Sequence, residues 1–156
     1  MTMMNENAHD RVTEFVTVMI GGHLFGLPIA RVQDVFVPAR LTRVPLAPPE
    51  VAGILNLRGR VVTAIEMRTR LDLGIRQPGQ PLMAIGIELK GESYGLLVDS
   101  VGEVMQLPNS ACEAKPANLD GGLARVAAGI YRLEGQLMIV LDVDRVLDIK
   151  PGAVAA

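Results

Sequence analysis

The sequence carries the same pattern twice, and this internal repeat restricts the possible folds more than any other feature of the chain. Phe25-Gly26-Leu27 returns 69 positions later as Tyr94-Gly95-Leu96. A second block, which begins with Gly53-Ile54, returns 76 positions later as Gly129-Ile130. Two blocks that recur in the same order indicate two similar units of about 70 residues each. Because a unit of that size is short of core on its own, we expect the two units to share apolar surface.

Short apolar segments joined by two-residue turns indicate β-hairpins. Residues 11–20 alternate between apolar and polar side chains, and Gly21-Gly22 turns the chain into residues 23–29. In this register Val18 opposes Phe25, so the apolar side chains of both segments lie on the same face.

The central hairpin folds back at Arg58-Gly59. Its register places Leu55 opposite Val62 and Gly53 opposite Ala64. Both faces of the hairpin are mostly apolar, which predicts that both are covered. A third hairpin of the same kind joins residues 129–133 to 136–141.

Short strands bounded by glycine and proline predict a mainly all-β fold built from small barrels. We expect helical turns over residues 67–71 and 143–149, the second with Asp142 as its N-cap, and a surface loop over 108–123.

The same pattern predicts one domain over residues 11–150. We expect its two subdomains to be intertwined and to span approximately 11–75 and 76–150, with a disordered tail at 1–10 and a frayed tail at 151–156.

Composition excludes several classes of function. The net charge of −2 and the isoelectric point near 5.7 argue against nucleic acid as a partner. No apolar run approaches the roughly 18–20 residues of a membrane span, and the polar start lacks the apolar core of a signal peptide, so we expect a cytoplasmic protein. The single cysteine, Cys112, and the two histidines, His9 and His23, form no motif for metal binding or catalysis. We therefore expect no enzymatic activity and no cofactor.

Arginine is distributed unevenly between the two copies. Arg58, Arg60, Arg68 and Arg70 of the first copy correspond to uncharged or acidic residues of the second. One interpretation is a solvated basic face. The other is an anion-binding site, because arginine pairs well with phosphates and carboxylates; its candidate ligands are Arg40, Arg43, Arg58, Arg60, Arg68 and Arg70.

The motifs of both copies resemble those of CheW-type chemotaxis adaptor proteins. The resemblance rests on residues 53–62, which read Gly-Ile-Leu-Asn-Leu-Arg-Gly-Arg-Val-Val, on Phe25-Gly26-Leu27, and on Gly95-Leu96-Leu97-Val98-Asp99. It extends over about residues 13–149. It implies two five-stranded Src-homology-3-like β-barrels packed around a shared hydrophobic core.

The resemblance also implies a function. Members of this family are non-enzymatic scaffolds that couple the cytoplasmic tips of methyl-accepting chemoreceptors to the regulatory domain of the histidine kinase CheA. A chain of this kind is expected in the cytoplasm, recruited to membrane-associated receptor arrays without inserting into lipid, and with weak or no self-association. The alternative keeps the fold and assigns the arginines to an anionic ligand, such as a nucleotide second messenger, that modulates motility signalling.

The resemblance assigns two sets of contact residues. The receptor-binding residues would be Asn56, Arg58, Val98, Val101 and Val104. The kinase-binding residues would be Val32, Asp34 and Gly53, lying on or under the contact surface.

Overall fold

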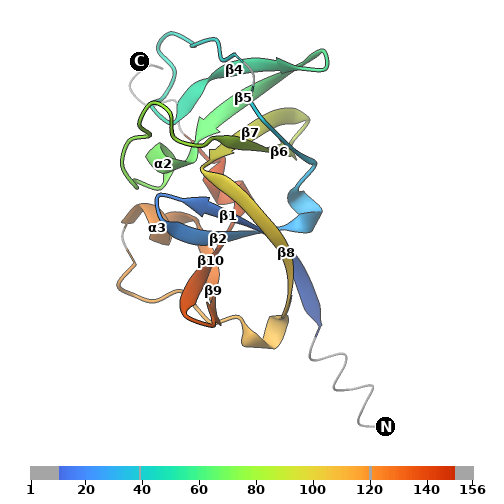
Figure 1. The fold of residues 1–156 in the computed structure, drawn as a ribbon, viewed down its shortest axis with the longest axis vertical. Coiled ribbons are helices and arrows are strands. Elements are labelled where there is room, and N and C mark those ends of the chain that lie inside the picture. Colours follow the sequence, from blue (N-terminus) through green and yellow to red (C-terminus); the bar gives the residue numbers. More distant parts are fainter. Residues whose placement is uncertain (1–10, 39, 120, 150–156) are drawn as a thin grey trace.

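The computed structural model describes residues 11–38, 40–119 and 121–149 and consists of ten strands with short helical segments (Figure 1). The strands are β1 (Val12–Ile20), β2 (His23–Pro28), β3 (Asp34–Phe36), β4 (Val51–Leu57), β5 (Arg60–Glu66), β6 (Met83–Leu89), β7 (Glu92–Val98), β8 (Ser100–Pro108), β9 (Ala127–Leu133) and β10 (Gln136–Leu141). The helical segments are η1 (Ile29–Arg31), α2 (Met67–Arg70), η2 (Asn109–Ala111), α3 (Gly121–Val126) and α4 (Val143–Val146). The expected all-β fold is confirmed, while both predicted tails lie outside the described residues.

The ten strands form two five-stranded sheets with the same internal order. One sheet runs β8-β1-β2-β10-β9 and the other β3-β6-β7-β5-β4. Under the repeat, β1 and β2 correspond to β6 and β7, while β3, β4 and β5 correspond to β8, β9 and β10. Each sheet therefore combines the opening hairpin of one copy with the last three strands of the other, joined by the parallel pairs β2·β10 and β5·β7.

Because of this exchange, the expected boundary near residue 75 does not divide one sheet from the other. That boundary separates the two copies of the repeat, not the two sheets, because each sheet draws strands from both halves of the chain. In Figure 1 the sheet that contains β1 and β2 lies below the sheet that contains β4 to β7.

The predicted hairpin registers are confirmed. Val18 pairs with Phe25 in the β1–β2 hairpin, and Leu55 pairs with Val62 in the β4–β5 hairpin. At the second turn Arg58 and Gly59 both have positive φ, 53° and 84°. This backbone twist matches the twist of the flanking strands, which explains why two residues suffice to close the hairpin.

One apolar core extends between the two sheets. It contains Val18 and Phe25 from the lower sheet and Ile85 and Leu96 from the upper one, together with Met67 of α2. The prediction that the two units share apolar surface is confirmed.

The prediction of a surface loop over residues 108–123 is wrong in part. Within it lies η2, and the chain then enters α3, whose Leu123 and Val126 are only 4% and 1% exposed. Two glycines at the start of α3 weaken its helical signal, but the apolar spacing of three residues is enough to anchor one turn against the core.

The second helical turn is also shorter than expected. Asp142 is the N-cap of α4 and accepts a hydrogen bond from the backbone N–H of Arg145 (3.3 Å). The helix ends at Val146, three residues before the predicted end. No helix in the described part of the chain is long and apolar enough to cross a membrane.

Candidate functional site

Each sheet has one edge that pairs with nothing on its outer side in the described residues. The β4 edge is covered by a bridge from Thr42 to Ile54, and the β9 edge by the equivalent bridge from Glu113 to Ile130. The other two edges, β3 and β8, pair only inward, with β6 and β1. Since β3 and β8 correspond under the repeat, the molecule presents two equivalent open edges, and open edges are places where another protein can add strands or pack.

Asp34 and Arg58 meet beside the β3 edge. Arg58 projects from the β4–β5 turn with 79% of its side chain exposed, and its Nη1 lies 3.9 Å from Oδ2 of Asp34. Residues assigned by the resemblance to two different partners therefore lie next to each other. Because Arg58 is so exposed and the contact is long, the pair contributes little to stability, and both charges remain available to a partner.

Gly86 makes room for the Asp34 carboxylate. It lies directly opposite Asp34 in the β3–β6 pairing, and a Cβ at this position would collide with Oδ1 of Asp34. Beside it Val35 is 42% exposed, so the edge carries one acidic and one apolar group. Gly86 could not be recognised from the sequence, because its local pattern is that of an ordinary strand glycine.

Asn56 fixes the turn that carries Arg58. Its Oδ1 accepts a hydrogen bond from the backbone N–H of Gly59 at 2.9 Å. The Asn56 side chain is exposed as well, so it is available to a partner while it holds the turn.

Gly53 lies beneath the surface rather than on it. It is buried with φ of 153°, and a Cβ there would lie 2.6 Å from the backbone oxygen of Thr42. Gly53 thus allows the close approach that covers the β4 edge. The partly buried Val32 packs against the central core.

The three valines assigned to the receptor differ in their exposure. Val98 is 1% exposed and belongs to the core, whereas Val104 is 48% exposed on β8. Val101 is partly buried beside it and pairs with Val18 of β1. Of the three, Val101 and Val104 form the surface of the β8 edge.

Two further apolar residues accompany this edge and were missed from the sequence. Val12 and Ile29 are exposed and line a hollow of about 410 Å³ beside β8. Their exposure depends on strand pairing between distant segments, which no local pattern reports.

The six arginines considered for an anion do not gather at one site. Arg68 donates two hydrogen bonds to Asp99, at 3.0 and 2.7 Å, and its side chain is 13% exposed. Arg70 donates to backbone carbonyls at the end of α4. The guanidinium of Arg68 is therefore engaged by Asp99 and that of Arg70 by the α4 carbonyls, while Arg40, Arg43 and Arg60 are exposed elsewhere.

Arg68 belongs to a network of charged side chains that joins the two sheets. Arg76 bridges Glu66 at 2.9 Å and Asp99 at 2.8 Å, and Asp99 also accepts from the backbone N–H of Gly21, in the turn of the other sheet. Burial alone would raise the pKa of Asp99, but hydrogen bonds from Arg68, Gly21 and Arg76 outweigh it and hold the pKa below its usual value. Asp99 and Gly21 are distant in sequence from the other members, so the repeat gave no sign of the network.

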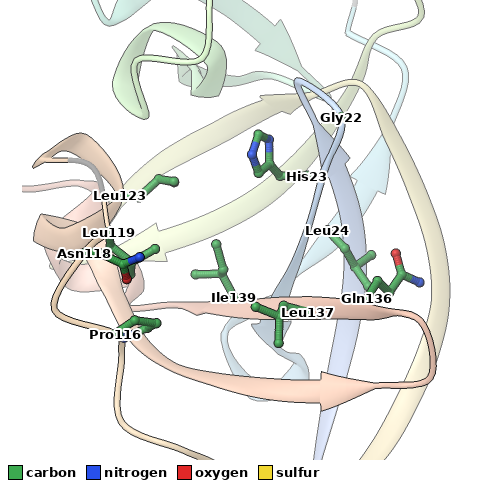
Figure 2. A pocket seen from close by; sticks show the side chains of 10 residues that line it. All are labelled: Gly22, His23, Leu24, Pro116, Asn118, Leu119, Leu123, Gln136, Leu137 and Ile139. Atoms are coloured by element: carbon green, nitrogen blue, oxygen red, sulfur yellow. The ribbon is translucent and has the colours of Figure 1, made fainter.

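A mostly apolar hollow of about 500 Å³ opens beside β2 and β10 (Figure 2). His23 lines it together with Leu24, Leu119, Leu123 and Ile139, and Nδ1 of His23 lies 3.2 Å from the backbone oxygen of Gly21. No carboxylate or thiol is among its lining residues. Across the described ranges, no group of three or more histidine, cysteine or acidic side chains could hold a metal ion.

Comparisons with known proteins agree over almost the whole chain. The model of the CheW-like domain family matches residues 14–150. The chain is 26% identical to the chemotaxis protein CheW of Rhizobium meliloti, over 85% of this chain and 86% of the relative. It is also 26% identical to the chemotaxis protein CheW of Bacillus subtilis, over 86% of each. The crystal structure of the scaffolding protein TtCheW from Thermoanaerobacter tengcongensis matches with a TM-score of 0.79 and 26% identity, covering 89% of this chain and 94% of that one.

Proposed function

The chain belongs to the CheW-like domain family, and from this premise we propose that it is a non-enzymatic adaptor that couples chemoreceptors to the histidine kinase CheA. The observation that carries the proposal is the pair of open sheet edges, β3 and β8, one on each sheet of the described residues. An adaptor needs two separate docking surfaces, and the exchanged strands supply one on each sheet.

The β3 edge is the proposed surface for the kinase. Asp34 and Val35 offer a charge and an apolar contact on a strand whose outer side has no pairing partner in the described residues. The regulatory domain of CheA would dock against this edge, with Val32 packed against the core next to it. The buried Gly53 contributes by shaping the β4 edge of the same sheet.

The proposed receptor surface combines Asn56 and Arg58 with the apolar β8 edge at Val101 and Val104. A helical receptor tip would place apolar side chains against the valines and a carboxylate near Arg58. Val98 contributes by packing beneath this surface. In this role the protein works in the cytoplasm, held at a receptor array by its partners and not by lipid.

Binding measurements on single variants test the proposal. We would titrate the protein separately with a CheA regulatory domain and with a receptor cytoplasmic fragment. Arg58→Asn is expected to weaken receptor binding about tenfold, and Asp34→Asn to weaken kinase binding by a similar factor. Asparagine tolerates positive φ, so Arg58→Asn removes the charge without disturbing the turn.

The matched control is Arg132→Gln on β9. Arg132 is an arginine of comparable exposure, 67%, paired with Glu113 on the sheet that carries neither proposed charge. Its replacement should leave both affinities unchanged. Absence of binding to either partner by the unchanged protein, or equal losses for Arg132→Gln and Arg58→Asn, would contradict the proposal.

A further inference from the structure

A third pocket, apart from the open edges, lies where α2, α3 and α4 come together. It has a volume of about 490 Å³ and is lined by Glu50, Arg70, Arg125, Arg145, Asp148 and Ile149. Its size is within the range of sites that hold small ligands. Three of its six lining residues are arginines, which makes its chemistry unlike that of the apolar hollow beside β2 and β10.

Arg70 is fixed in place before any ligand arrives. Its Nε donates to the carbonyl of Val146 at 2.8 Å, and its Nη2 donates to the carbonyls of Arg145 and Asp148 at 2.9 and 3.3 Å. Nη1 has no hydrogen-bond partner in the described part of the chain. A guanidinium held this way loses little conformational entropy when it binds an anion with its remaining donors.

The other two arginines keep most of their hydrogen-bonding capacity. Arg125 is exposed and has neither an ion pair nor a hydrogen bond within the described residues. Arg145 has only a long contact to Asp142, at 3.5 Å, and is 58% exposed. Both can turn toward a ligand without breaking a strong interaction.

The two carboxylates of the pocket do not neutralise these arginines. Neither Glu50 nor Asp148 forms an ion pair within the described residues, and three guanidiniums against two carboxylates leave the lining with one excess positive charge. The three guanidiniums come from α2, α3 and α4, and a guanidinium presents its N–H donors in a planar fork. This arrangement suits a tetrahedral anion with several peripheral oxygens better than a planar carboxylate.

We propose that this pocket binds a small phosphate dianion, either inorganic phosphate or the phosphate group of a monoester. The site needs both copies of the repeat, since Arg70 comes from the first and Arg125 and Arg145 from the second. A bound phosphate would therefore tie α2 to α3 and α4 and stabilise the junction between the two copies. This inference does not depend on the adaptor role.

Calorimetric titration of the full chain with sodium phosphate, and separately with ribose 5-phosphate, tests the proposal. Sodium chloride at matched ionic strength is the blank, and thermal unfolding is a second readout because a ligand of the folded state raises Tm. We expect saturable binding of at least one ligand, and the tighter of the two identifies inorganic phosphate or a monoester as the source. No saturable heat with either, or the same Tm rise in sodium chloride, would overturn the proposal.

Two variants make the test specific to the pocket. Arg125→Gln should weaken binding about tenfold or more without loss of folding, because Arg125 makes no internal hydrogen bond. Glu50→Gln should tighten binding about threefold, because it removes a repelling charge. Arg132→Gln is the control and should change nothing. Unchanged affinity in Arg125→Gln, or weaker binding in Glu50→Gln, would show that the anion binds elsewhere.

Discussion

At the scale of the residue, glycines and charges are matched to particular neighbours. Gly86 leaves space for the Asp34 carboxylate, and Gly53 leaves space for the backbone of Thr42. Gly53 could be singled out from the sequence because it recurs as Gly129. At Gly129 an added Cβ would lie 2.8 Å from Sγ of Cys112. The sequence alone did not reveal why a glycine is needed at these two positions. In each copy the close neighbour of the glycine comes from a loop that has no repeated pattern.

Replacement of Gly53 by alanine tests this packing. The added Cβ would lie 2.6 Å from the backbone oxygen of Thr42, at a φ of 153°. We expect Gly53→Ala to lower the free energy of unfolding by about 2–4 kcal/mol, measured by urea denaturation. Gly121→Ala, where a Cβ would meet nothing within 4 Å, is the control and should change it by less than about 0.5 kcal/mol. Equal effects of the two substitutions would contradict this account.

At the scale of the element, the hairpins could be predicted and α3 could not. Two-residue turns and the period of two fix both the register and the buried face of a hairpin, as the pairs Val18–Phe25 and Leu55–Val62 show. A six-residue helix such as α3 is too short to display a period. Its stability comes from Leu123 and Val126 in the core, which only the tertiary structure reveals.

The central hairpin should depend on the side chain that holds its turn. Asn56→Ala removes the acceptor for the N–H of Gly59, and we expect a loss of about 1 kcal/mol in stability. Amide hydrogen exchange at Gly59 should become faster. Asn56→Asp keeps an acceptor at the same position and should retain slow exchange at Gly59. Equal exchange rates in the alanine variant and the unchanged protein would show that the hydrogen bond does not hold the turn.

At the scale of the whole molecule, the two copies exchange strands and a charged network links the resulting sheets. The repeat predicted two units with a common core, and this is what the structure has. It did not predict which strands are exchanged, because a repeat reports which segments are alike and not which segments pair. Arg76 comes from the segment between α2 and β6. The repeat did not draw attention to Arg76, because this residue has no counterpart in the other copy.

The network makes stability depend on pH. The pKa of the Asp99 carboxyl is lowered in the folded protein, so the unfolded chain binds its proton more readily. The stabilisation is therefore present above the unfolded pKa of about 3.9 and is lost as the pH falls through the lower folded value.

Asp99→Asn tests this dependence. We expect it to lower the free energy of unfolding at pH 7 by about 2–4 kcal/mol, because Arg68 and Arg76 lose a partly buried ion-pair partner. The variant should also lose less additional stability than the unchanged protein between pH 5 and about 3. Urea denaturation across this range measures both effects. Parallel pH profiles for the two proteins would rule out Asp99 as a source of the pH dependence.

The central claim of the proposed adaptor function is that one molecule of this protein binds the receptor and the kinase CheA at the same time. The measurement that tests it most directly is the mass, by size-exclusion chromatography with light scattering, of a mixture of this protein with a CheA regulatory domain and a receptor cytoplasmic fragment. If β3 and β8 are separate docking edges, the mixture gives a ternary complex whose mass includes all three components, and Asp34→Asn reduces it to the complex with the receptor fragment. Two binary complexes that compete for this protein, with no ternary species, would contradict the account.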